Sequence, residues 1–300
     1  GRLDLLVIGM NSFTAGRLDL LRLGLPGFEA LERLRPKMAY GNRLLLARNG
    51  RFAQTALSDQ VCRTGWSWGA ATGDFDNDGA EDIYVVNGHI SGESAEDYGG
   101  RFWRHDIYLG TSRNDPVLDA YFRSAQAKFQ GAGKSYGGFE KNRFFLNRGG
   151  KSFLEAGYLM GVALEDDCRN AVCDDLDGDG KLELLVTTFK VHPRIQQSLH
   201  LFPNFSSDAG HWIGVRLRES GPGFSPVGAH VILTTPRGKQ IRRLVTGDSY
   251  RSQHANTAHF GLGGETQVAR FEVVWPNGRR KTVPNPAVDR YHLILPDQRQ

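Results

Sequence analysis

The sequence predicts an all-β fold, in which repeated β units are followed by a small antiparallel β domain. Three observations support this prediction. Apolar runs are short, and the 37 glycines greatly outnumber the 3 methionines, which favours many short strands joined by tight turns. Two acidic loops share one pattern, and hairpin signatures recur with them. A chain of 300 residues, 40% of them hydrophobic, has enough apolar side chains for a sizeable core and for two domains.

The first segment, residues 1–8, is predicted to be the end of an acidic loop followed by a strand. Gly1 and Asp4 have the same spacing as Gly79 and Asp82 in a complete loop further along the chain. We therefore expect the chain to begin inside a repeat, with any targeting segment and further repeats before it.

Two insertions interrupt the predicted repeats. Residues 10–41 contain short amphipathic helical segments at 17–22 and 28–34, separated by a Pro-Gly pair. Residues 88–140 are rich in Gly, Tyr, Phe and Arg, with a predicted helix at 119–130. Because binding surfaces usually lie on long structured insertions of a rigid scaffold, residues 88–140 are the predicted surface for a protein or glycan ligand.

Hairpins are predicted at three places. Residues 42–52 and 142–153 share an Asn-Arg start, an apolar strand, a turn with Asn or Gly, and an answering Phe. Residues 198–204 are a weaker third copy. Each segment has the pattern of a strand, a turn and a returning strand.

Two loops are predicted to bind calcium. Each has acidic residues at positions 1, 3, 5 and 9 and Gly at position 6, whose backbone freedom lets the acidic side chains converge on one ion. Position 7 offers a backbone carbonyl. Without a cation, carboxylates this close repel one another by roughly 4 kcal/mol per close pair. The predicted ligands of the two ions are Asp74, Asp76, Asp78, Ala80 and Asp82 in the first loop and Asp175, Asp177, Asp179, Lys181 and Glu183 in the second.

Two other kinds of loop share part of this pattern. An EF-hand needs a Glu at position 12 and flanking helices, but position 12 is Val85 or Val186, and both loops lead into β-branched, apolar residues typical of strands. A solvated acidic turn would explain one such loop. Two loops in the same register, each followed by a strand, favour calcium.

The repeats predict blades of a β-propeller. The order of hairpin, strand, acidic loop and strand recurs in residues 42–87 and 142–188, and a period near 50 residues with four short strands is typical of propeller blades. About three blades fit in residues 1–206. Because a ring needs about four to eight blades, upstream sequence or a partner is expected to complete it.

A separate antiparallel β domain is predicted for residues 207–296, with the joint near 205–210. Strands are expected at 211–217, 229–235, 240–245 and 271–275, joined by turns with Gly and Pro. Trp212 and Trp275 lie among β-branched residues and are expected in the core.

Composition argues against some functional classes. The net charge of +4 is small and the Lys and Arg residues are scattered, so a nucleic-acid partner has little support. No apolar run is long enough to span a membrane. Cys62, Cys168 and Cys173 are either partly paired in a disulfide or small buried apolar side chains.

These motifs resemble two families. Residues 1–204 resemble FG-GAP (VCBS-type) repeats of the integrin α-chain propeller kind. The C-terminal part is similar to ASPIC/UnbV domains, in residues 211–217, 247–253, 259–263 and 274–278. The combination resembles the cartilage acidic protein family and its bacterial relatives, which implies a secreted or surface-associated calcium-binding protein. This chain departs from that pattern in its mildly basic charge and in its incomplete N-terminal repeats.

The leading expectation is an extracytoplasmic calcium-binding module with a binding or structural role, in a secreted, periplasmic or cell-surface protein. Calcium sites of this type suit millimolar extracellular calcium. A weaker hypothesis is a subunit of a larger assembly, because the predicted ring is incomplete.

The main alternative to the leading expectation is a calcium-dependent biosynthetic enzyme of a cyclase-like kind. The candidate catalytic residues are His89, Arg101, Trp103, His105, Asp106, Tyr250, Gln253, His254 and His259. Six of them also have a structural explanation. His89 would form a turn, Trp103 would fill a gap between blades, Tyr250 and Gln253 would close a loop, and His254 and His259 would be unrelated positions rather than a pair of metal ligands.

Overall fold

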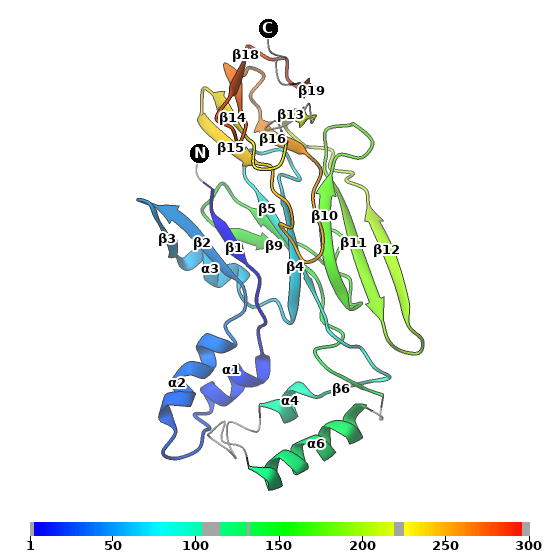
Figure 1. Cartoon of the computed structure of the whole chain (residues 1–300). Helices are drawn as coiled ribbons and strands as arrows, with labels where there is room; N and C mark the ends of the chain where they lie inside the picture. The colour runs from blue at the N-terminus through cyan, green and yellow to red at the C-terminus, as the bar shows by residue number, and fades with distance from the viewer. Residues whose placement is uncertain (1–2, 104–114, 131–132, 219–224, 296–300) are drawn as a thin grey trace.

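The structure, a computed structural model, describes residues 3–103, 115–130, 133–218 and 225–295. The all-β prediction is confirmed at the level of the fold class, because strands make up 40% of the chain and helices 14%. The C-terminal domain lies at one end, three sheets lie in the middle, and most helices lie at the other end (Figure 1). The described sheets do not close into a barrel.

The middle part of the molecule contains three antiparallel sheets. Hairpins form at both full copies of the predicted motif, and both acidic loops connect neighbouring antiparallel strands. The sheets are β1 (Leu5–Val7), β2 (Arg43–Arg48) and β3 (Arg51–Gln54); β4 (Ser67–Gly73), β5 (Asp82–Asn87), β8 (Arg143–Asn147) and β9 (Phe153–Glu155); and β10 (Cys168–Asp174), β11 (Glu183–Lys190) and β12 (Gln196–Phe202).

The N-terminal segment has the same local structure as the later repeat. Asp4 Oδ1 accepts a hydrogen bond from Ala47 N, and Asp82 Oδ1 accepts one from Asn147 N, both at 2.7 Å. In each case an acidic residue at the start of one strand contacts the neighbouring hairpin. Asp4 therefore occupies the structural position of Asp82.

The predicted third hairpin, at residues 198–204, is wrong. Its first part is β12, which pairs with β11 in a regular antiparallel register, but no returning strand follows. Pro203 has no amide hydrogen to donate to a hairpin. Asn204 instead donates from Nδ2 to Phe75 O (2.8 Å) and Leu182 O (3.2 Å), which directs the chain toward the C-terminal domain.

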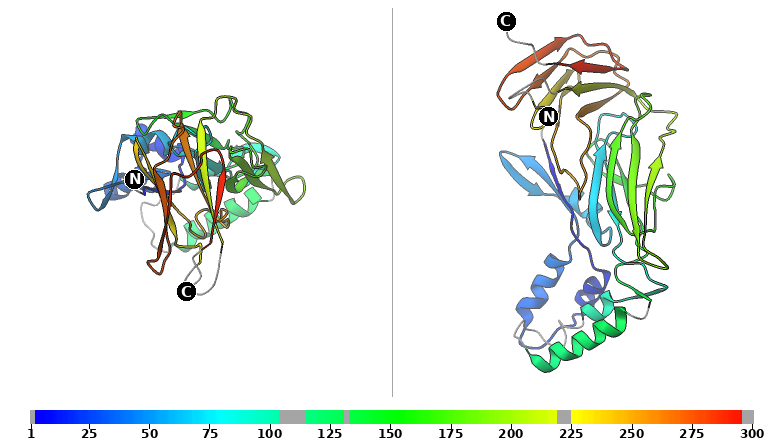
Figure 2. Two further views of the ribbon diagram at one scale, coloured as in Figure 1. Left: turned by 90° about the horizontal axis from the view of Figure 1, so that it is seen from above. Right: turned by 45° about the vertical axis from the view of Figure 1, so that its right-hand side comes forward.

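The central sheet is buried on both faces. In β5, Ile83 and Val85 enter a core shared with β2, whereas Tyr84 and Val86 enter a core shared with β10 and β11. Successive side chains of a strand point to opposite faces, so a strand between two sheets has no exposed position. The views from two directions agree that the three sheets lie side by side (Figure 2).

The two insertions meet in one helical lobe. Ala15 and Ala39 from the first insertion and Trp103 from the second form a small buried core. Trp103 is therefore buried between the insertions, and the expectation that it fills a gap between blades is wrong. The lobe contains α1 (Phe13–Leu20), α2 (Glu29–Met38), α4 (Gly99–Phe102), α6 (Pro116–Gln130) and the short parallel pair of β6 (Ser94–Asp97) and β7 (Lys134–Ser135), while α3 (Ala56–Val61) packs beside β2.

The C-terminal domain consists of two sheets around an apolar core that includes Phe260, Phe271 and Trp275. One strand pair, β13 with β19, is parallel, so the prediction of a wholly antiparallel domain is wrong there. Trp212 is buried at the junction with the middle sheets, as described below. The sheets are β16 (Thr257–Gly263), β13 (His211–Leu217) and β19 (Tyr291–Ile294); and β15 (Gly238–Arg243), β14 (His230–Thr235), β17 (Arg270–Val274) and β18 (Arg280–Pro284).

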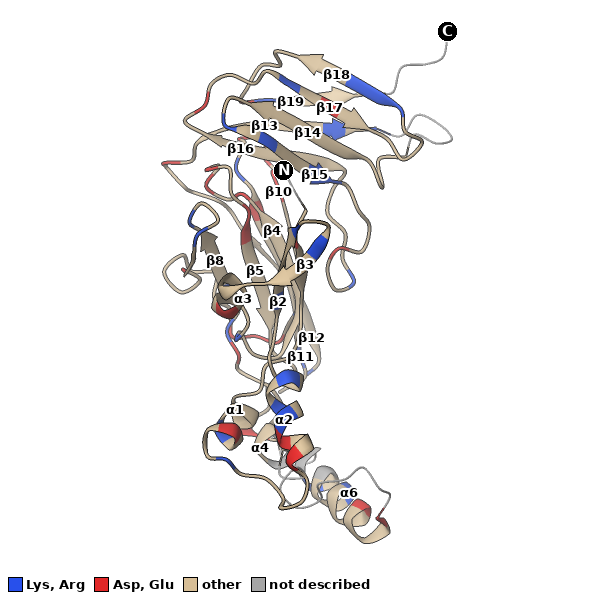
Figure 3. Cartoon of the chain, turned by 90° about the vertical axis from the view of Figure 1, so that its left-hand side faces the viewer, with Lys and Arg blue, Asp and Glu red and all other residues tan. Residues whose placement is uncertain are grey.

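Positive charge is distributed along the molecule. Lys and Arg residues are spread from the C-terminal domain to the helical lobe (Figure 3). None of the helices in the described part of the chain combines the length and apolar character needed to cross a bilayer.

The three cysteines are buried free thiols. Cys62, Cys168 and Cys173 therefore correspond to the alternative of small buried apolar side chains rather than to a disulfide.

A half-buried carboxylate anchors the second insertion, and it predicts a pH effect. Glu140 accepts a hydrogen bond from Trp66 N, and burial raises its pKa to about 7. Because the folded state then binds a proton more tightly than the unfolded state, the free energy of unfolding should fall as pH rises from about 4.5 to about 7, by on the order of 2 kcal/mol. Denaturant titrations of Glu140→Gln should show a smaller fall. An unchanged pH dependence would contradict this origin.

Candidate calcium sites at the domain junction

The first acidic loop joins β4 to β5 and gathers three carboxylates. Asp74, Asp76 and Asp78 each offer an oxygen atom within 4.8 Å of the others. Asp74 fixes the curl of the loop, because its two oxygens accept hydrogen bonds from Asp78 N (2.9 Å) and Gly79 N (2.8 Å). Asn77 and Gly79 have positive φ angles of 57° and 97°.

The second loop joins β10 to β11 and repeats this geometry. Here Asp175, Asp177 and Glu183 offer oxygen atoms within 4.8 Å of one another. Asp175 accepts hydrogen bonds from Gly178 N and Gly180 N, both at 2.7 Å. The two loops therefore share a backbone conformation as well as a sequence pattern.

The loops differ at position 9. Both oxygens of Asp82 accept backbone hydrogen bonds, from Phe75 N (3.1 Å) and Asn147 N (2.7 Å), and Asp82 is not in the group of three. Glu183 accepts from Leu176 N (2.8 Å) and is also in its group. The side chain of Glu is one methylene longer than that of Asp, so Glu183 can accept the backbone hydrogen bond from Leu176 and still reach Asp175 and Asp177.

The remaining predicted ligands lie in the loops without joining these groups. Asp179 accepts from Lys181 N (2.8 Å) and forms an ion pair with Lys181 Nζ (3.0 Å). Ala80 donates its backbone N–H to Asp78 Oδ1 at 2.7 Å. The backbone carbonyls of Ala80 and Lys181 remain predicted ligands.

The electrostatics of the loops favour a cation. Asp74 is 1% exposed, and burial together with the nearby Glu81 raises its pKa to about 8. Burial also raises the pKa of Asp82 to about 7 and raises that of Glu183. A hard divalent ion such as Ca²⁺ prefers oxygen ligands and removes repulsion between carboxylates. The donor sets therefore fit two calcium ions, of which one would be held by Asp74, Asp76 and Asp78 and the other by Asp175, Asp177 and Glu183.

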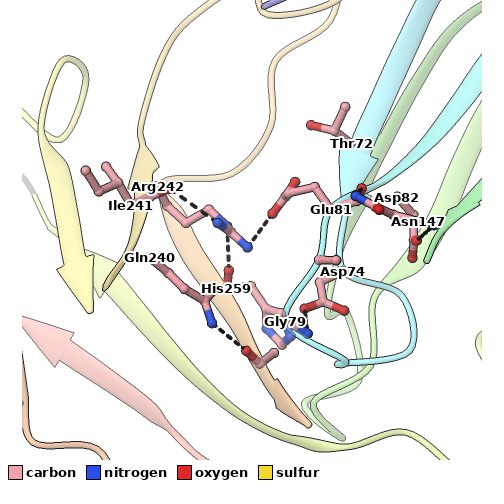
Figure 4. Close-up of polar contacts among 12 residues, drawn as sticks. Thr72, Asp74, Gly79, Glu81, Asp82, Asn147, Gln240, Ile241, Arg242 and His259 are labelled. Carbon is pink, nitrogen blue, oxygen red and sulfur yellow. Dashed lines mark hydrogen bonds and ion pairs between the residues drawn. The ribbon is translucent and has the colours of Figure 1, made fainter. Parts of the chain in front are cut away.

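The C-terminal domain lies directly on both loops. Tyr291 donates its hydroxyl to Asp175 Oδ2 (2.8 Å), and Gly263 N donates to Asn77 O (2.6 Å). Arg242 of β15 forms an ion pair with Glu81 of the first loop at 2.5 Å (Figure 4). The candidate sites are thus at an interface between domains.

Sequence reasoning missed several residues of this interface. Asn77, at loop position 4, has a positive φ, which Asn tolerates better than most residues. An Asn here, where the second loop has Gly178, was the one signal in the sequence that marked this position. Trp212 packs against His259 and Tyr291, with ring centroids 5.4 Å and 4.7 Å apart. No local pattern reveals such contacts, because their partners are distant in the sequence.

The C-terminal domain also matches a known family. Residues 221–300 match the family model described as ASPIC and UnbV. This match supports the ASPIC/UnbV assignment of the C-terminal part. The matched region includes strands β14 to β19, and β13 pairs with two strands of this ASPIC/UnbV domain. No curated protein matches the chain.

Two of the predicted candidates for catalysis share a neighbour. The rings of His89 and Tyr250 lie 5.5 Å and 5.2 Å from the ring of Trp68, and His89 also stacks on Trp66 at 4.7 Å. His254 Nδ1 pairs with Asp248 Oδ2 at 2.8 Å. Gln253 is exposed, and Arg101 lies in α4. His105 and Asp106 lie outside the described residues.

His254 and His259 have separate partners. Neither belongs to a group of three possible metal ligands among the described residues. His259 faces Asn77 of the first acidic loop, whereas His254 faces Asp248 of its own connection. His254 and His259 are therefore unrelated positions rather than a pair of metal ligands.

Proposed function

We propose that this chain binds two calcium ions and acts as an extracytoplasmic binding or structural module. The observation that carries the proposal is the pair of equivalent loops, each with three acidic oxygens within 4.8 Å of one another and with buried members such as Asp74 and Asp175. Buried carboxylates are unfavourable without a compensating charge. Because the two loops have the same backbone conformation, we expect each of them to bind an ion of the same kind.

The three middle sheets support the further proposal of FG-GAP-type propeller blades. The first sheet shares a core with the second and the second shares one with the third, in the order of the chain. Each acidic loop joins two adjacent strands of one sheet. Calcium at this position would stabilise the connection between strands. Secreted, periplasmic or cell-surface locations, where calcium is millimolar, suit loops of this type.

The helical lobe is the proposed surface for a protein or glycan ligand. Helix α6 exposes apolar side chains, with Val117 78% and Tyr121 62% exposed. Val117 and Tyr121 are four residues apart and so are neighbours on one face of the helix, and contiguous exposed apolar surface is typical of interaction sites. The lobe stands at the end of the molecule opposite the ASPIC/UnbV domain (Figure 1).

Calorimetric titration tests the calcium proposal. The chain, stripped of metal with a chelator and then dialysed, should bind two calcium ions. Asp74→Ala and Asp175→Ala should each reduce the stoichiometry to one, because each removes a central carboxylate. Asp208→Ala, which changes an exposed residue of the linker between the domains, should still bind two. No binding at millimolar calcium would refute the proposal.

A further inference from the structure

We propose that the ASPIC/UnbV domain is part of the calcium-binding unit, with Tyr291 and His259 as positioning residues, so that calcium binding and docking of this domain stabilise each other. This inference rests on the proposed calcium sites. All the predicted ligands lie in the two acidic loops, but the ASPIC/UnbV domain supplies the residues that hold these loops in place.

Tyr291 holds a ligand of the second loop. Its hydroxyl donates to Asp175 Oδ2 at 2.8 Å. The guanidinium of Arg216 lies 3.8 Å from the centre of the Tyr291 ring, and its Nη2 contacts Asp175 O at 3.4 Å. The ASPIC/UnbV domain and strand β13, which pairs with it, therefore orient both the side chain and the backbone of Asp175. Groups that hydrogen-bond to a metal ligand fix its orientation and raise metal affinity.

His259 acts through Asn77. The Asn77 side chain donates from Nδ2 to Gly180 O (2.9 Å), so its Oδ1 is the acceptor for His259 Nε2 (2.8 Å). His259 is 8% exposed, and burial lowers its pKa to about 3, so the ring is neutral and carries its hydrogen on Nε2. One side chain of the first loop thus connects the second loop with the ASPIC/UnbV domain.

The backbone of the first loop is also fixed from the C-terminal side. Gly210 N donates to Asp76 O at 3.0 Å, and Gly263 N donates to Asn77 O at 2.6 Å. Gly261 lies so close to the loop that a Cβ atom there would be 2.1 Å from Asp74 Oδ2. Strand β16 therefore packs against a predicted ligand without space for a side chain.

These contacts couple the two events. The acidic residues must converge for an ion to bind, and their convergence gives the loop shape that the ASPIC/UnbV domain contacts. Without the ion, repulsion between the carboxylates favours a more open loop, which would lose these hydrogen bonds. Coupling between two binding events is reciprocal, so a docked domain raises calcium affinity by the same factor by which calcium favours docking.

The first test compares two Tyr→Phe variants by calorimetric calcium titration. Tyr291→Phe should weaken one of the two sites by about tenfold, the lower end of the effect of removing a group that orients a ligand. Tyr250→Phe is the matched control, because its ring lies at the same domain junction but packs on Trp68; it should leave both affinities unchanged. Two unchanged sites in Tyr291→Phe, or equal losses at both sites in both variants, would overturn the role of Tyr291.

The second test measures hydrogen–deuterium exchange of the full chain with and without calcium. Calcium should slow exchange of the Gly210 and Gly263 amides, which donate to the first loop, at least tenfold. His259→Phe keeps an aromatic ring against Trp212 but removes the donor, and it should reduce this protection. Calcium binding by calorimetry without added protection would overturn the coupling alone. An absence of calcium binding would overturn the proposed function and the coupling with it.

Discussion

Removing calcium should lower the thermal stability of this chain more than any single surface substitution. A ligand that binds only the folded state adds about 2.7 kcal/mol when its free concentration exceeds Kd a hundredfold, so two sites together add about 5 kcal/mol. The midpoint of unfolding should therefore fall by on the order of 10 °C when calcium is replaced by excess chelator. Differential scanning calorimetry would measure this shift.

Variants separate the two sites in the same experiment. Asp175→Asn keeps the size of the side chain but removes the charge, so about half of the shift caused by chelator should remain. In chelator two opposing effects leave its midpoint near that of the unmodified chain. The amide has one acceptor oxygen where the carboxylate uses two, which costs about 1 kcal/mol, and the loss of the charge relieves repulsion with the other acidic residues of the loop. Asp208→Asn, on the exposed linker, should keep the whole shift. Identical melting curves with calcium and chelator would rule out structural calcium.

Gly180→Ala should destabilise the second loop and the domain junction together. Gly180 has a positive φ of 88°, and a Cβ atom there would lie 1.9 Å from Nε1 of Trp212. The left-handed conformation costs an L-residue about 1 kcal/mol or more, and forcing a methyl group into a packed contact costs about 1–3 kcal/mol. The free energy of unfolding, from denaturant titration, should fall by about 3 kcal/mol.

Gly178→Ala provides the matched control for this substitution. Gly178 lies in the same loop with a similar φ of 83°, but a Cβ atom there meets nothing within 4 Å. It should cost about 1 kcal/mol, the conformational term alone. Equal losses in the two variants would mean that the contact with Trp212 contributes little to the junction.

If both results hold, the second loop has two roles in one short segment. Its acidic residues would bind the ion, while Gly180 and the Asn77–Gly180 hydrogen bond (2.9 Å) connect it with the neighbouring loop and the ASPIC/UnbV domain. This arrangement explains why the candidate sites lie at the junction rather than on a free edge of a sheet.

The local elements could be predicted from neighbouring residues alone. The acidic loops have the predicted curl because Gly at position 6 and the Asp at position 1 form it within a few residues, through bonds such as Asp175 to Gly180 N. The two full hairpins also formed where their turn residues predicted. The third failed at Pro203, since a strand that leads into another domain has no returning partner.

The tertiary structure decided what each of these elements contacts. The hairpin at residues 142–153 joins β4 and β5 across the whole second insertion, and Trp103 is buried by residues of the other insertion. The pattern could not show whether the residue at position 9 is a calcium ligand. Asp82 accepts a hydrogen bond from the amide of Asn147, which is 65 residues away in the sequence. Tyr291 lies against Asp175 for the same reason: hydrophobic packing of distant strands sets these distances, and a local sequence pattern carries no information about them.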